Sequence, residues 1–217
     1  MGATVPVIRV VDDDEPFRTA ISRLLRAAGY QVRDYASAGA FLLADGGSEP
    51  GCVLLDLRMP GPNGLDLQSA LRKRDDALPV VFLTGHGTVP ATVRAMKDGA
   101  EDFLTKPVKR EVLLEAVRRA LARDAERRGA GEHLRRLRER FDGLTSRERA
   151  VMELVVAGRL NKQIAAAIGA SERTVKAHRA RVMAKMGAAS LADLIRSADR
   201  VLREPREPRE PATAGQA

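Results

Sequence analysis

The sequence predicts an α/β fold with a doubly wound, five-stranded parallel sheet, followed by a small all-α domain. In its first half, short and nearly continuous apolar runs alternate with helical patterns, and this alternation repeats along the chain. Continuous apolar runs are typical of parallel strands that are covered on both faces. After residue 144 the helical patterns continue but the strand signals stop. We therefore expect two domains of different fold class.

The strands are expected where the apolar runs lie, at residues 7–11, 31–35, 52–55, 80–83 and 102–104. The helices between them carry end signals. Pro16 lies in the first turn of one helix, and Gly29 ends it. We expect these helices at residues 16–28, 38–44, 63–74, 89–97 and 109–127.

The second half of the chain has a different organisation. Gly129 and Gly131 interrupt the helical pattern, so we expect a first domain at 1–127 and a linker with helical tendency at 128–141. Four helices, at 146–157, 161–168, 172–186 and 191–201, are expected to form a second domain at 142–201. Thr145 and Glu148 predict a capping box at its start. Residues 202–217 contain Arg-Glu-Pro three times, and proline at every third position excludes a helix and predicts a disordered or polyproline-II tail.

Charge is distributed unevenly between the two halves. Residues 1–127 contain 18 basic and 18 acidic residues, so the whole net charge of +8 comes from the 19 basic and 11 acidic residues of 128–217. A basic domain beside a neutral one favours a polyanionic partner, although a solvated basic surface gives the same count.

Other sequence features concern the compartment. The sequence has no apolar run of 18 residues or more and no export signal at its N-terminus. Its single cysteine, Cys52, excludes an internal disulfide and is expected to be a small buried apolar residue. We therefore expect a cytoplasmic protein that does not contact a membrane.

Chemically active side chains follow the expected strands. Asp12 and Asp13 come directly after the first strand, Asp56 after the third, Thr84 after the fourth and Lys106 after the fifth. The carboxyl ends of parallel strands form the ligand crevice of such a sheet. Three carboxylates that meet there need a compensating charge, and Mg²⁺ prefers oxygen ligands. A carboxylate nucleophile, a metal, a hydroxyl and an ammonium group indicate phosphoryl transfer to an aspartate.

Four segments carry a family resemblance: VVDDDEP, LLDLRMPGPNGLDL, VVFLTGHG and AMKDGAEDFLTKP. Together they resemble the receiver domain of bacterial response regulators over about residues 6–125, which implies a flavodoxin-like fold. The resemblance implies that Asp56 accepts a phosphoryl group from a sensor histidine kinase. It also implies that Asp12, Asp13 and the Arg58 backbone carbonyl join Asp56 in a Mg²⁺ site.

The same resemblance implies further roles. Thr84 and Phe103 would form a switch pair, Lys106 would contact the phosphoryl group, and the Lys106–Pro107 peptide would be cis. An alternative is a phosphatase of the haloacid dehalogenase type, because Asp12 and Asp14 resemble the start of its motif. The motif of those enzymes continues with Thr or Val and usually with Gly soon after, whereas Glu15 and Pro16 follow in this sequence. We therefore expect a regulator rather than an enzyme.

The expected helices at 161–168 and 172–186, joined by a short turn that contains glycine, outline a helix-turn-helix. The second of these helices has a face with cations and small residues that can enter a major groove: Arg173, Lys176, Ala177, Ala180 and Arg181. An amphipathic helix with a solvated basic side is the alternative. RNA is disfavoured, because only 3% of the chain is aromatic.

The segment LTSRERAVMELVVAGRLNKQIAAAIGASERTVKAHRARVMAKM resembles the FixJ/NarL (LuxR-type) DNA-binding domain, and its FixJ branch most closely. The resemblance covers about residues 142–200. It makes the five residues above candidate groove contacts. Ala180 stands where some relatives carry a basic residue. Candidate backbone and phosphate contacts are Lys162, Ser171, Thr174, His178 and Arg179.

Together the resemblances imply a FixJ-type response regulator, in which phosphorylation controls dimerisation and sequence-specific DNA binding. The expected partners are a histidine kinase, double-stranded DNA, RNA polymerase and a second copy of the chain. Relief of an inhibitory contact across residues 128–141 is the alternative to dimerisation. A phosphorylation-driven module without DNA specificity is another alternative, which the basic helix-turn-helix disfavours.

Overall fold

The computed structural model describes residues 4–44, 49–73, 78–85 and 87–203. Its contacts divide the chain into two compact units, Met1–Arg128 and Gly129–Ala217.

The first unit is built on a five-stranded sheet in which every pair of neighbouring strands is parallel, in the order β2-β1-β3-β4-β5. The strands are β1 (Val7–Val11), β2 (Gln31–Tyr35), β3 (Gly51–Asp56), β4 (Val80–Thr84) and β5 (Asp102–Thr105). The predicted doubly wound α/β fold is confirmed. The strand order reverses between β1 and β3, which is where ligands bind in folds of this class.

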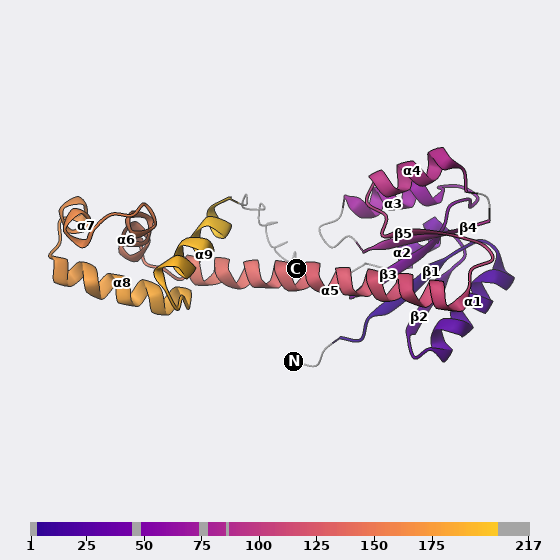
Figure 1. Ribbon diagram of the computed structural model, residues 1–217, viewed down its shortest axis with the longest axis horizontal. Coiled ribbons are helices and arrows are strands. Elements are labelled where there is room, and N and C mark those ends of the chain that lie inside the picture. The colour runs from indigo at the N-terminus through magenta and orange to yellow at the C-terminus, as the bar shows by residue number, and fades with distance from the viewer. Residues whose placement is uncertain (1–3, 45–48, 74–77, 86, 204–217) are drawn as a thin grey trace, which may run out of the picture. The chain divides into compact units, whose positions relative to one another are not determined.

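Helices cover both faces of this sheet (Figure 1). They are α1 (Glu15–Ala27), α2 (Ala38–Ala44), α3 (Gly64–Arg72), α4 (Val89–Lys97) and α5 (Arg110–Asp142). One apolar core joins the sheet to α1 and α5 through residues such as Leu25 and Leu113. The other joins the opposite face to α2, α3 and α4 through residues such as Phe41 and Leu67. Covering on both faces explains why the strands are continuously apolar.

Cys52 lies in β3 and is fully buried. Burial disfavours the charged thiolate and raises the pKa of Cys52 to about 12.

The second unit contains α6 (Ser146–Val156), α7 (Asn161–Ile168), α8 (Glu172–Met186) and α9 (Leu191–Arg203). Their apolar faces pack on one core, to which α5 contributes Phe141. Gly169 and Gly187 end α7 and α8 with φ values of 64° and 65°, a left-handed conformation that favours glycine. None of the described helices is long and apolar enough to span a bilayer.

The expectation that glycines interrupt the helical pattern at residues 129–131 is wrong, because α5 continues from Arg110 to Asp142. A glycine disfavours a helix by only about 1 kcal/mol relative to alanine. The flanking residues are mostly Ala, Glu, Arg and Leu, which are strong helix formers. Of the tail predicted at 202–217, Leu202 and Arg203 belong to α9, and residues 204–217 lie outside the described residues.

The capping box at the start of α6 is confirmed and has an additional partner. The Thr145 backbone N–H donates to Glu148 Oε2 at 2.9 Å, and Lys185 Nζ of α8 donates to the same oxygen at 2.7 Å. These hydrogen bonds lower the pKa of Glu148 to about 2, and the bond from Lys185 contributes more than the bond from the Thr145 backbone N–H.

This pKa shift predicts a pH dependence of the second unit. A carboxyl whose pKa is lower in the folded state stabilises it above the unfolded value near 4.5, and this contribution is lost as pH falls towards 2. Hydrogen exchange of the α6 and α8 amides should therefore show that Glu148→Gln lowers protection at pH 6, and that its difference from wild type shrinks towards pH 2. Glu153→Gln, an exposed change in α6, is the control and should show no such difference.

Candidate functional site

Three carboxylates meet where β1 and β3 end. Asp12 and Asp13 follow β1, Asp56 is the last residue of β3, and the two strands are paired neighbours. One carboxylate oxygen from each residue lies within 4.8 Å of the others. Asp12 and Asp56 are only 2% and 6% exposed, whereas Asp13 faces solvent. The structure therefore brings together the acids that the sequence separates by 43 residues, from position 13 to position 56.

Lys106 supplies the nearest positive charge to this acidic cluster. Its Nζ lies 2.6 Å from Asp12 Oδ2 and 3.2 Å from Asp56 Oδ1, and it also stands 4.1 Å from the centre of the Phe17 ring. Burial raises the pKa of Asp12, although the hydrogen bond from Lys106 opposes this shift. The Lys106–Pro107 peptide is cis.

The orientation of Asp56 is fixed by its two oxygens having different partners. Oδ1 faces Lys106, and Oδ2 accepts a hydrogen bond from the Arg58 backbone N–H at 2.9 Å. The start of α3 packs closely against the backbone of this residue, since a Cβ on Gly64 would lie 2.4 Å from the Asp56 carbonyl oxygen. The hydrogen bond from the Arg58 N–H keeps the backbone of Arg58 near the carboxylate, as its expected carbonyl contribution to a metal site requires.

The donor set fits a small, hard cation. Mg²⁺ binds oxygens at about 2.0–2.1 Å, so two of its ligands are at most about 4.2 Å apart. Oxygens within 4.8 Å of one another reach such positions by small side-chain rotations. Asp12, Asp13 and Asp56 are the residues that would hold the ion.

The expected switch residues lie on the neighbouring strands β4 and β5. Thr84, the last residue of β4, is buried, and Phe103 of β5 packs against Phe82 with ring centres 5.8 Å apart. Gly87 is a residue that the sequence analysis missed. A Cβ at this position would lie 2.8 Å from a Phe103 ring carbon and 3.2 Å from the Thr84 methyl group. The only sequence signal was a glycine shortly after the fourth strand.

The helix-turn-helix is formed by α7 and α8. Val175, Val182 and Met186 are buried on one face of α8. The residues predicted to enter a major groove are all exposed: Arg173, Lys176, Ala177, Ala180 and Arg181. A cationic helix face with small side chains between the cations fits a DNA groove.

The expected backbone and phosphate contacts fall into two groups. Lys162 and Thr174 are exposed, and Ser171 caps α8 by accepting the Thr174 N–H at 3.1 Å. By contrast, Arg179 is half-buried and donates to Asn161 at the start of α7 at 2.9 Å. Its guanidinium therefore fixes α7 against α8 through Asn161, a residue that the sequence analysis missed.

His178 is also half-buried, and its Nδ1 has no hydrogen-bond partner among the described residues.

Comparisons with protein families agree with this division of the chain. The family model described as "Response regulator receiver domain" matches residues 8–118. The model described as "Bacterial regulatory proteins, luxR family" matches residues 142–198.

Individual relatives resemble the chain over most of their length. Nodulation protein W of Bradyrhizobium diazoefficiens is 45% identical, over 91% of this chain and 87% of that protein. Transcriptional regulatory protein FixJ of Azorhizobium caulinodans is 44% identical, over 91% and 93%. Among solved structures, response regulator StyR has 43% identity and a TM-score of 0.81, over 90% of this chain and 99% of that one.

The packing around Gly87 predicts an unequal effect of two loop substitutions. Gly87→Ala should lower the unfolding free energy by about 1–3 kcal/mol, because the new methyl group must displace Phe103 or Thr84. Gly85→Ala is the control, since a Cβ there would meet no described atom within 4 Å. Urea denaturation of both variants measures the difference, and equal stabilities would show that Gly87 does not restrict this packing.

Proposed function

The chain belongs to the response regulators that join a receiver domain to a LuxR-family DNA-binding domain, and on that basis we propose that Asp56 is its phosphoryl acceptor. One observation carries this assignment: Lys106 Nζ contacts Asp12 and Asp56 within a cluster of three carboxylates. Phosphorylation by a kinase is general behaviour of receivers, and receivers bind Mg²⁺ at an acidic pocket of this kind.

The donor of the phosphoryl group is proposed to be a phosphohistidine of a sensor kinase. Asp56 Oδ1 attacks phosphorus, a P–O bond forms, and the P–N bond to the histidine breaks, with the electron pair leaving on the imidazole. The Arg58 N–H, which donates to Oδ2, holds the attacking carboxylate in position. Lys106 then pairs with a phosphoryl oxygen, and the Thr84 hydroxyl donates to another. Bound Mg²⁺ would neutralise further charge on the phosphoryl oxygens.

The signal is proposed to leave the receiver through the face made by α4, β5 and the start of α5. A phosphoryl group adds roughly two negative charges beside Lys106 and Thr84. When Thr84 moves towards it, the contact between Gly87, Thr84 and Phe103 opens, and Phe103 can fill the space. Apolar side chains already lie exposed on this face: Val89, Val93, Met96 and Val112. We propose that this face binds a second copy by two-fold symmetry.

The output is proposed to be sequence-specific DNA binding by α8. Arg173, Lys176 and Arg181 would contact bases or phosphates, and Ala177 and Ala180 would allow close approach to the groove. Lys162, Ser171 and Thr174 would contact the DNA backbone. Arg179 and His178 are the weaker candidates, because both are half-buried.

Pairing of receivers tethers two such domains, which raises the effective concentration of the second domain. A cytoplasmic location and contact with RNA polymerase complete the proposal.

The acceptor assignment is tested by labelling with acetyl phosphate or a cognate kinase. Asp56→Asn should abolish labelling, because the amide cannot form the acyl phosphate. Asp13→Ala should greatly reduce the affinity for Mg²⁺, so that labelling needs a higher Mg²⁺ concentration, since it removes one of three ligands. Glu111→Gln, an exposed change in α5, is the control. Full labelling of the Asp56→Asn protein contradicts the assignment.

The DNA interface is tested by substituting Lys176. Lys176→Ala should reduce affinity by about 1–3 kcal/mol in a sequence-dependent way if the side chain reads a base. If it contacts only phosphate, the loss should be uniform and the salt slope should fall by about one. Arg200→Ala removes an exposed cation of α9 and is the control. Unchanged affinity and unchanged salt slope would remove Lys176 from the interface.

The pairing of receivers is tested by light scattering with beryllofluoride, a phosphate mimic. The mimic should convert monomer to dimer and raise DNA affinity together. Moving the equilibrium from about 1:99 to 99:1 needs about 5.5 kcal/mol of differential stabilisation. Val93→Asp, on the exposed face of α4, should prevent the dimer without reducing labelling of Asp56. A rise in DNA affinity without dimerisation would instead favour relief of inhibition across residues 128–141.

A further inference from the structure

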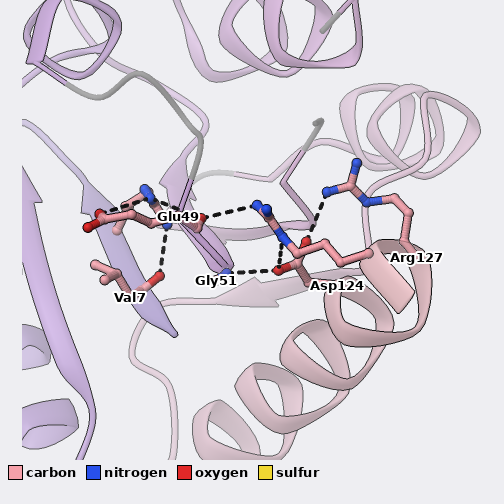
Figure 2. Close-up of polar contacts among 7 residues, drawn as sticks. Val7, Glu49, Gly51, Asp124 and Arg127 are labelled. Atoms are coloured by element: carbon pink, nitrogen blue, oxygen red, sulfur yellow. Dashed lines mark hydrogen bonds and ion pairs between the residues drawn. The ribbon is translucent and has the colours of Figure 1, made fainter. Parts of the chain in front are cut away.

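A second polar cluster lies at the opposite ends of the strands that carry the acceptor site (Figure 2). It consists of Arg9, Glu49, Gly51, Asp124, Arg127 and Arg128, and we call it the polar lock. None of these residues belongs to the acceptor site or to the candidate DNA interface.

Asp124 is the centre of the polar lock. This α5 residue is only 1% exposed, although it lies in a highly charged segment of the sequence. Its carboxylate accepts from the Gly51 N–H at 2.9 Å, from Arg127 at 2.9 Å and from Arg128 at 2.8 Å. A buried carboxylate is strongly destabilising unless it is paired and hydrogen-bonded, and here three donors satisfy it. Asp124 therefore ties α5 to the first residue of β3.

The backbone at Glu49 provides a second tie. Its carbonyl oxygen accepts from Arg128 at 3.1 Å and from Arg9 at 3.3 Å. Arg9 is fully buried in β1 and also donates to the Val7 carbonyl at 3.0 Å. One carbonyl thus joins the end of the receiver part of α5 to β1, the strand beside the central strand β3.

Gly51 makes this arrangement specific to one backbone geometry. Its φ is 152°, and a Cβ would lie 1.9 Å from the Val7 carbonyl oxygen. Only glycine fits at this close approach of β1 and β3. The N–H that Asp124 holds therefore belongs to a rigid point of the sheet.

The polar lock is also the last described place where the first unit holds α5. β1 and β3 are paired from Val7↔Gly51 to Val11↔Leu55, so the lock and the acidic cluster lie at opposite ends of the same two strands. Gly129 follows Arg128 directly, and residues 129–133 are exposed. At Gly129 and Gly131 a Cβ would meet no described atom within 4 Å. Beyond the polar lock, the helical turn at residues 129–133 is therefore supported mainly by the backbone hydrogen bonds of α5 itself.

We propose that Asp124 is a positioning residue that fixes the direction in which α5 leaves the receiver. The inference rests on the proposed function and adds a requirement to it. The gain in occupancy of a second DNA half-site depends on the tether: it is greatest when the tether matches the span between the half-sites, and it falls when the helix base can point elsewhere. The lock supplies that restraint without contacting phosphate or DNA. Loss of the polar lock should therefore weaken binding to DNA with two half-sites more than binding to DNA with one.

The test uses the full-length chain with Asp124→Asn, and Glu126→Gln on the exposed side of α5 as the control with the same charge change. Duplexes are recovered by selection from random DNA with beryllofluoride-treated wild type, and a matched duplex has one half-site scrambled. Asp124→Asn should bind the two-half-site duplex about tenfold more weakly, a part of the roughly 10²–10⁴ that linkage can add. Its affinity for one half-site, its labelling by acetyl phosphate and its dimerisation should equal those of wild type.

Hydrogen exchange gives a readout that does not depend on DNA. Amides of residues 125–133 should exchange about tenfold faster in Asp124→Asn than in the control, because the helix base has lost its restraint. Arg128→Gln, which removes the donor to both Asp124 and the Glu49 carbonyl, should reproduce both effects if Asp124→Asn does not fold.

Three outcomes would overturn the proposals in distinguishable ways. Equal weakening on both duplexes would mean that Asp124 acts through general stability, and unchanged binding to both would mean that the lock does not position the helix. Either result overturns the positioning role. Failure of the selection to enrich any duplex with the wild type would overturn the proposed DNA-binding function itself.

Discussion

The mutual repulsion of three carboxylates at one edge of the sheet is the constraint on which the receiver depends. Asp12 and Asp56 are buried side by side because β1 and β3 are neighbours. The cation within β1, Arg9, donates instead to the Val7 and Glu49 carbonyls at the opposite end of these strands. Lys106 arrives from the far edge of the sheet, after β5, and pairs with both carboxylates. The strand order therefore determines both the repulsion and its partial compensation. Under the proposed function, a divalent cation or a phosphoryl group would change this balance, and with it the positions of Lys106 and Thr84.

The acidic cluster could be predicted from the sequence because its residues occupy equivalent positions along the chain. Each follows a continuous apolar strand, and parallel strands end at the same edge. Gly87 and Asn161 obey no such rule. Gly87 matters because Phe103 and Thr84 approach its backbone, and Asn161 because Arg179 of another helix reaches it. Such contacts depend on how elements pack, which a single sequence does not encode locally.

The behaviour of α5 shows the same limit from two directions. Gly129 and Gly131 have low helix propensity, but the good helix formers around them carry the helix through. Conversely, Asp124 sits among charged residues in the sequence and would be expected to face solvent, yet it is almost completely buried. Local patterns describe average tendencies, and both exceptions lie where the two units of the chain meet in sequence.

The burial of Cys52 has a practical consequence for spectroscopy. Maleimides, nitroxide reagents and oxidants react with the thiolate form of cysteine. In the folded protein this form of Cys52 is scarce, because its pKa is raised to about 12, and the side chain is completely buried. Since Cys52 is the single cysteine of the chain, the wild-type background behaves towards such reagents as one without a reactive thiol. A cysteine introduced at an exposed position of either unit would accept a probe selectively, with no need to replace a core residue of β3.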